Sequence, residues 1–438
     1  MGEIYPFRAL HYNPARVVDL SQVVTQPYDK ISGEMQARYY AAHPANLVRV
    51  ILRRQGEENP YREAAREFHN WIEDHTLISE QEPCLYPYLQ EFQVPGGARR
   101  QRWGWIALLR LADYSSGVVH RHEQTLSGPK ADRLELLKAT RANFGHIFML
   151  YSDPRGEVEG LLRAASPPKP WQQVTDEYGT LHQVGRVMDP AVIESVVEAM
   201  RDKKLVIADG HHRYETSLTY RNLRRVEAPG DDRAEYVMAT LVPMESAGLL
   251  ILPTHRVVHG LTNFEWEDFA RKAKQWFEEQ DLSSASTGKP TASELRAALE
   301  KAGGERPSWI AYAGRQRVAL LTLRRDVDLA RWMPEVAEGL RHLDVVLLHR
   351  LCIERALGID PEAVREQKNL RYVRELEAAL KEVDESRAQV AFLMNPTPMA
   401  AVWNNALAGQ VLPQKSTDFY PKLLSGLTLY WMDNPRGL

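Results

Sequence analysis

An apolar run that leads directly into a dense polar turn is the feature that most constrains the fold of this 438-residue chain. Residues 205–208 are all apolar, as in a buried strand. The polar residues that follow are Asp209, Gly210, His211, His212 and Arg213. Beyond them the apolar spacing predicts a helix. A strand, a turn and a helix in direct succession are typical of a mixed α/β fold.

Other segments predict further helices and strands around this step. Residues 85–94 and 102–111 are rich in β-formers and flank a Pro-Gly-Gly turn, which predicts a hairpin. Residues 59–72 and 264–277 place their apolar side chains on one helical face. The last hundred residues predict mostly helices. We therefore expect an α/β (mixed α+β) protein with added hairpins and a mostly helical C-terminal part.

The length and the 44% hydrophobic content predict two or three cores. Three prolines between positions 167 and 170 favour an extended path, so we expect a linker there. The predicted domains are residues 1–165, an N-terminal α/β region, residues 166–290, which carry the polar turn, and residues 291–438, the helical region.

Charge and cysteine content exclude several classes of protein. The 55 Lys and Arg residues nearly balance the 58 Asp and Glu residues, which argues against a nucleic-acid or membrane-surface partner. Cys84 and Cys352 are the only cysteines, so a disulfide framework is excluded. No apolar run is long enough to span a bilayer. We expect a cytoplasmic protein.

The polar turn predicts an anion site. The start of a helix presents backbone N–H groups without intrahelical partners and the positive end of the helix dipole. Two histidines and Arg213 at that point suit a phosphate, and Glu215 follows in the same helix. Asp209 could cap the helix, orient a histidine such as His212, or bind Mg²⁺. The alternative is that Asp209 only caps the helix and that both histidines are solvated.

A second polar segment contributes one carboxylate and several cations. Glu123 could act as a general base if it lay within about 3 Å of a substrate hydroxyl. A solvated surface position is the alternative for each of its neighbours. The other candidates in this segment are His122, Lys130, Asp132, Arg133 and Arg141.

Two further segments complete the set of candidates. Lys415 and Ser416 lie in a proline-bounded stretch, residues 413–422, that could close over a phosphate or form an exposed loop. His255 and Arg256 follow an apolar strand, where sites often gather. Adjacent histidines rarely chelate one ion together, because successive helical residues point about 100° apart, so no zinc is expected.

The whole chain resembles a bacterial and archaeal family catalogued as domain of unknown function 1015. The matching stretches are residues 6–10, 27–29, His122-Glu123, Lys130, Asp132-Arg133, 208–216, 252–256 and 413–426. They occur in the order of that family and span nearly the full length.

Residues 209–213 also resemble the phosphate-handling motif of the ParB and sulfiredoxin superfamily, which includes an archaeal free serine kinase. This resemblance implies a ParB-like core in which the turn binds nucleotide phosphates, and a separate glutamate that deprotonates serine. No residue of this sequence can be matched locally to that glutamate, so we select Glu123 because of its chemistry. The residues Pro27-Tyr28-Asp29 lie where we would look for catalytic groups near the start of the chain.

Together these observations favour a small-molecule phosphotransferase. It would use ATP or ADP, with Mg²⁺ as a candidate ion, and L-serine is the acceptor that the resemblance suggests. Glu123, Asp209 and His212 are the predicted catalytic residues. Gly210, His211, His212, Arg213, Lys130, Arg133, Lys415 and Ser416 would bind phosphate. A nucleotide-binding regulatory module of ParB-like type and a metal-dependent hydrolase are the alternatives.

Overall fold

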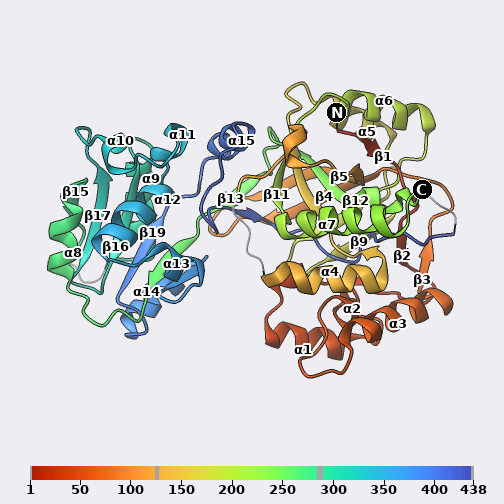
Figure 1. The fold of residues 1–438 in the computed structure, drawn as a ribbon, viewed down its shortest axis with the longest axis horizontal. Coiled ribbons are helices and arrows are strands. Elements are labelled where there is room, and N and C mark those ends of the chain that lie inside the picture. Colours follow the sequence, from red (N-terminus) through yellow and green to blue (C-terminus); the bar gives the residue numbers. More distant parts are fainter. Residues whose placement is uncertain (1, 124–127, 284–289, 436–438) are drawn as a thin grey trace. The chain divides into compact units, whose positions relative to one another are not determined.

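Two large sheets organise the chain (Figure 1). The computed structural model describes residues 2–123, 128–283 and 290–435. The chain divides into a first unit, made of Met1–Arg121, Thr125–Leu250 and Phe419–Leu438, and a second unit, made of His122–Gln124 and Ile251–Asp418. The predicted domain boundaries at 165/166 and 290/291 fall inside these units.

The described part of the first unit contains a nine-stranded mixed sheet. The order of eight of its strands is β6 (Val119–His120), β11 (Leu205–Asp209), β8 (Ile147–Tyr151), β12 (Tyr236–Pro243), β5 (Arg99–Arg110), β4 (Tyr86–Gln93), β10 (Leu181–Val184) and β9 (Gln172–Thr175). The ninth strand, β1 (Ile4–Tyr5), also pairs with β5. Strand β11 runs parallel to β6 and antiparallel to β8. The short pairs are β2 (Leu10–Tyr12) with β3 (Leu77–Ser79), and β7 (Ala142–Asn143) with β21 (Tyr430–Trp431).

Helices pack against this sheet and against each other. They are α1 (Gly33–Ala42), α2 (Val48–Ile51), α3 (Pro60–Glu73), α4 (Gly128–Thr140), α5 (Glu157–Ala165), α6 (Pro190–Met200) and α7 (His211–Glu227). Helices α4 and α7 lie side by side, and so do α3 and α4 (Figure 1). Tyr214 of α7 is buried in the core under the sheet, where its hydroxyl donates to Ala112 O at 2.8 Å and accepts from Ala112 N. This core anchors the start of α7.

The second unit contains, within the described residues, a six-stranded antiparallel sheet. Its order is β15 (Phe277–Asp281), β17 (Val318–Leu323), β16 (Ser308–Tyr312), β19 (Val390–Met394), β14 (His255–Val258) and β18 (Leu370–Val373). The helical elements are α8 (Trp266–Ala273), α9 (Ala292–Gly303), α10 (Leu329–Trp332), α11 (Glu338–Arg341), α12 (Asp344–Leu347), the π-helix η5 (Leu348–Ala356), α13 (Pro361–Arg365), α14 (Leu376–Asp384) and α15 (Met399–Leu407). Strands β13 (Leu250–Leu252) and β20 (Asp418–Tyr420) pair with each other.

Both faces of the second sheet are buried. On β16, Trp309 packs in the cluster formed with α8, α10, α12 and η5, and Ile310 packs in the opposite cluster, formed with α9 and α14. This alternation follows from the two-residue period of a strand. The second unit therefore has one hydrophobic cluster on each face of its sheet.

The mixed α/β fold class is as predicted. The hairpin of β4 and β5 and the helix α3 match the patterns at 85–111 and 59–72. The helix predicted at 264–277 is too long, because Phe277 already begins β15. The C-terminal region is less uniformly helical than predicted, since β16 to β19 supply much of the second sheet. In the described part of the chain, no helix has the length and apolarity needed to cross a membrane.

Candidate functional site

The polar turn of the first unit has the predicted strand–turn–helix geometry. Strand β11 ends at Asp209, Gly210 follows with φ of 93°, and the 17-residue helix α7 begins at His211. A positive φ of this size favours glycine, because a Cβ would be strained there. Gly210 itself is the N-cap residue, and no side chain caps the helix. The prediction that Asp209 caps α7 is therefore wrong.

Asp209 instead pairs with two cations. Its Oδ2 accepts from Arg213 Nη2 at 2.9 Å, and its Oδ1 lies 3.4 Å from Lys422 Nζ. Burial would raise the pKa of Asp209, but the charges of Lys422, Arg213 and Lys30 outweigh it and hold that pKa well below its usual range. The carboxylate is thus ionised at neutral pH and is too weak a base to accept a substrate proton.

Arg213 is held over the turn by its own neighbours. Its Nη1 donates to His146 O, and a Cβ built on Gly210 would come within 3.2 Å of the guanidinium carbon. A Cβ on Gly145 would reach within 3.1 Å of Nη1. Two positions without a side chain therefore leave room for this guanidinium beside the first turn of α7. His211 and His212 are half-buried in that turn.

A fully buried arginine adds to the positive charge. Arg102, 1% exposed, donates from Nε to Gln90 Oε1 at 3.0 Å and from Nη2 to Pro421 O at 2.6 Å. Burial lowers its pKa to about 10, and the charge of Asp209 opposes that shift, so Arg102 is charged at pH 7. The charges of Arg102, Arg213, Lys422 and Lys30 thus all act with that of Asp209. The cluster has an excess of positive charge that favours an anion.

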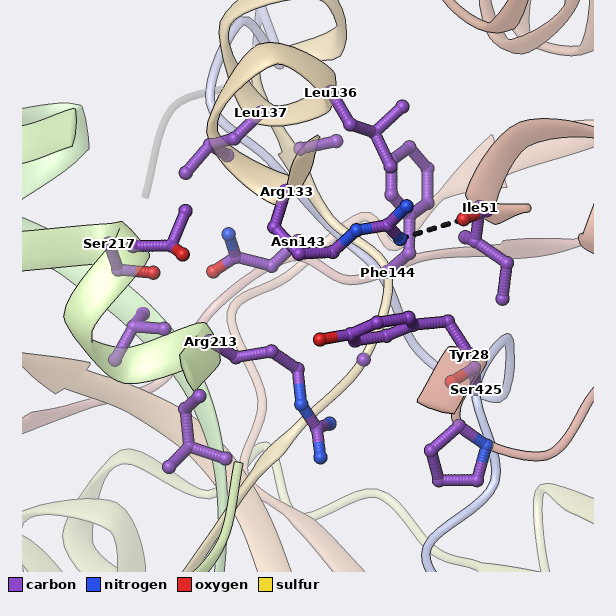
Figure 2. A pocket seen from close by; sticks show the side chains of 16 residues that line it. Tyr28, Ile51, Arg133, Leu136, Leu137, Asn143, Phe144, Arg213, Ser217 and Ser425 are labelled. Carbon is purple, nitrogen blue, oxygen red and sulfur yellow. Dashed lines mark hydrogen bonds between the residues drawn. The ribbon is translucent and has the colours of Figure 1, made fainter. Parts of the chain in front are cut away.

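A pocket of about 80 Å³ opens beside Arg213 (Figure 2). In Figure 2 the hydroxyl of Tyr28 points toward the side chain of Arg213. Arg133 stacks on that ring, with its Cζ 4.2 Å from the ring centroid. The hydroxyl of Thr216 is buried without a hydrogen-bond partner among the described residues. The other polar lining residues are Asn143, Ser217 and Ser425, and the apolar wall includes Ile51, Leu136, Leu137 and Phe144.

Several predicted cations of the first unit are already paired with carboxylates. Lys130 contacts Glu215, and Arg133 donates to Asp132 Oδ2 at 2.7 Å. Arg141 donates to Asp433 at 2.8 Å and pairs with Asp231 at 3.0 Å. Arg133 still lines the pocket, but Arg141 does not belong to its lining. Their pairing supports the fold and leaves Arg213 as the arginine closest to the turn.

The remaining predicted residues lie together in the second unit. Glu123 Oε1 accepts from Lys415 N at 2.7 Å, and His122 Nε2 lies 2.8 Å from Thr417 Oγ1. Ser416 Oγ donates to Pro413 O at 2.5 Å. The structure therefore brings the segments at 122–123 and 413–417 together.

Arg256 belongs to the same cluster. Its Nη2 donates to Lys415 O at 3.0 Å. His255 Nδ1, by contrast, accepts from Met394 N at 3.1 Å across the sheet, and burial lowers the pKa of this histidine to about 3. His255 is neutral at pH 7 and supports the pairing of β14 with β19.

Three functional candidates of the first unit had little or no signal in the sequence. Arg102 acts on Asp209 from a segment more than a hundred residues away in the chain, and nothing local marks it. Lys422 had a partial signal, because it ends the proline-bounded stretch at 413–422 and belongs to the family-like stretch at 413–426. Tyr28 had a partial signal, because it belongs to the family-like stretch at 27–29. Long-range contacts of this kind require the fold.

The surroundings of Asp209 do not suit a directly bound Mg²⁺. Magnesium prefers carboxylate and water oxygens with few competing cations. Both oxygens of Asp209 already face Arg213 and Lys422. Within residues 2–123, 128–283 and 290–435, no three His, Cys, Asp or Glu side chains are grouped as they would be around a metal ion. A metal-dependent hydrolase therefore lacks a supporting observation.

Comparison with protein families gives one match over most of the chain. A family described as "Protein of unknown function (DUF1015)" matches residues 4–346. The chain belongs to this family. A comparison of the DUF1015 chain with curated proteins found no match.

Comparison of this DUF1015 protein with solved structures gives matches at low identity and low TM-score. A conserved hypothetical protein from Pyrococcus furiosus is 11% identical, with a TM-score of 0.36 over 72% of this chain and 92% of its own. A free serine kinase in complex with AMP is 12% identical, with a TM-score of 0.34 over 71% and 89%. C-terminally truncated SbnI from Staphylococcus aureus is 10% identical, with a TM-score of 0.33 over 73% and 85%.

The glycine of the turn can be tested against a matched glycine. Gly210 and Gly230 have φ of 93° and 92°, but a Cβ on Gly230 meets nothing within 4 Å. Gly210→Ala and Gly230→Ala should each cost about 1–2 kcal/mol of stability from backbone strain. If the turn binds a nucleotide, as proposed below, Gly210→Ala alone should also displace Arg213 and weaken ADP binding by about tenfold or more. Calorimetric titration of both variants checks this, and equal affinities would contradict it.

A buried carboxyl of the second unit predicts a pH dependence of stability. Burial raises the pKa of Asp344 to about 7. Since the unfolded chain releases this proton near pH 4, stability falls as the pH rises from about 4 to about 7 and then levels off. The loss has an upper bound of roughly 4 kcal/mol.

Asp344→Asn should remove that loss. In urea unfolding, the stability of the variant relative to wild type should rise up to about pH 7 and then stay constant. Glu300→Gln changes an exposed carboxyl of the same unit and serves as the control. A difference between Asp344→Asn and wild type that is independent of pH would contradict the prediction.

Proposed function

We propose that this protein is a small-molecule phosphotransferase that binds the phosphates of ATP or ADP at the Gly210 turn. The observation that carries the proposal is the cluster of Arg213, Lys422, Lys30 and Arg102 around the start of α7. Helix N-termini bind phosphates through their backbone N–H groups and dipole. Preorganised cations at the same point would stabilise the charge that develops during transfer.

The proposed acceptor is a hydroxyl compound, and L-serine is the first candidate. This choice rests on the resemblance of residues 209–213 to the motif of the superfamily that contains free serine kinase. In the reaction, the hydroxyl oxygen forms a bond to the terminal phosphorus of the nucleotide. The bond from that phosphorus to the bridging oxygen breaks, and the shortened nucleotide leaves.

The hydroxyl proton must pass to a base in this scheme. We assign that role to Asp29 rather than to Glu123, because Asp29 and the turn belong to the same unit. Asp29 is exposed, and it follows Tyr28, which lines the pocket. Burial raises the pKa of Tyr28, the charge of Arg213 lowers it, and the charge of Asp29 raises it. The charge of Lys30 lowers the pKa of Asp209. Residues 28–30 and the residues of the turn therefore lie close enough for their charges to act on each other.

Product formation tests the proposal. The full-length protein is incubated with L-serine and either ATP or ADP, with Mg²⁺ in the buffer, and O-phosphoserine is measured by mass spectrometry. Time-dependent phosphoserine that requires both substrates supports the proposal. Nucleotide binding without product for serine or other small hydroxyl compounds would instead favour the regulatory module. Absence of nucleotide binding would exclude both.

A further inference from the structure

The second unit contains a pocket of its own, of about 260 Å³. Its polar lining residues include Thr254, Arg256, Asp344, Thr397 and Ser416. All its lining residues belong to the second unit. The volume suits a small metabolite, because ligand pockets for drug-sized molecules occupy roughly 300–1,000 Å³.

Arg256 is the residue that gives this pocket its chemical character. Its side chain is 2% exposed, yet its hydrogen bonds all go to neutral acceptors. The guanidinium donates to Thr254 O, to Lys415 O at 3.0 Å and to His349 Nε2 at 3.4 Å. Throughout the described residues, no carboxylate lies within ion-pair distance of it.

A buried charge in such surroundings is costly. Burial lowers the pKa of Arg256 to about 10 against the opposing charge of Glu123, so the group is still charged at pH 7. Hydrogen bonds to neutral acceptors offset only part of the hydration free energy that a buried ion loses. An oxyanion in the adjoining pocket would supply a directly paired negative charge, and guanidinium–oxyanion hydrogen bonds are among the strongest in proteins.

The other charged groups at the pocket do not replace that anion. Arg306 is paired with Glu278 at 2.7 Å, and Glu305 and His342 are exposed. Asp344 has its pKa raised by burial to about 7, so a large share of it is protonated at neutral pH and can donate a hydrogen bond. The pocket thus offers a guanidinium, a carboxylic acid and hydroxyls.

We propose that the second unit binds a small molecule through a carboxylate or phosphate group, held by Arg256 with Thr254 beside it. This site is distinct from the Gly210 turn and does not depend on the function proposed for that turn. A phosphate and a carboxylate would make the same contacts with Arg256, so both are tested.

Anion binding by the full chain tests this site. Arg213→Gln weakens the anion site proposed at the Gly210 turn and provides the background. Inorganic phosphate and acetate are titrated separately against chloride at constant ionic strength, and the unfolding temperature is followed. An anion that binds the folded protein gives a saturable rise in that temperature. We expect such a rise with at least one probe, and the stronger one identifies the group.

Variants then locate the effect. Arg256→Met should weaken the affinity at least tenfold, and Thr254→Val should weaken it several-fold. Thr262→Val, at an exposed position of the same unit, is the matched control and should bind as the background does. If Arg256→Met does not fold, Thr254→Val decides alone. Absence of saturable binding in the background, or equal binding by Thr254→Val and the control, would overturn the proposal.

Discussion

Replacing Arg213 by glutamine should lower the rate of phosphoryl transfer on the order of 10²–10³-fold. Glutamine keeps polar atoms near the turn but removes the charge that faces Asp209 at 2.9 Å and the donor to His146 O. The loss should appear in kcat as well as in nucleotide affinity, because the guanidinium would stabilise charge that grows in the transition state. Steady-state kinetics with serine and the active nucleotide measure it.

Arg225→Gln is the matched control for that variant. Arg225 lies in the last turn of the same helix, 52% exposed, and pairs with Glu235 at 2.5 Å. It is twelve residues, or roughly 18 Å, along the helix from Arg213. Its replacement should leave kcat within a factor of about two of wild type, as is typical of surface changes. Equal losses in both variants would mean that Arg213 acts only through the stability of α7.

Asp29→Asn should lower kcat on the order of 10²-fold or more while nucleotide affinity changes little. The amide keeps the size of the side chain but cannot take the proton of the acceptor. Asp202→Asn alters an exposed carboxyl of the same unit and should behave as wild type. An unchanged kcat in Asp29→Asn would remove Asp29 from the mechanism.

The turn could be predicted from the sequence because its determinants are local. A four-residue apolar strand, a glycine and an amphipathic helix follow one another directly, and the structure forms each of them. The role of Asp209 could not be predicted in the same way. Its partner Lys422 is 213 residues away, so only the tertiary fold brings the two together.

The grouping of the other candidates also depended on tertiary structure. Glu123 and Lys415 are 292 residues apart, yet a direct hydrogen bond joins them in the second unit. His122 and Glu123 belong to that unit although the described residues on either side of them in the chain belong to the first. Neither composition nor periodicity predicts that a short segment belongs to a different unit from its neighbours in the chain.

Arg141 shows a different limit of local reasoning. Its backbone has φ of 50°, and its guanidinium is shared between Asp231 and Asp433. The basic side chain suggested an anion site, but these two carboxylates come from distant parts of the chain. By pairing with these carboxylates, Arg141 stabilises the fold around α7.

Calorimetric titration of the full-length protein with ADP tests the central claim most directly. If the Gly210 turn binds nucleotide phosphates, wild type and Arg225→Gln should bind one ADP per chain with equal affinity, and Arg213→Gln should bind it at least tenfold more weakly. Absence of ADP binding by wild type, or equal affinity in all three proteins, would contradict the assignment of the turn as a phosphate site.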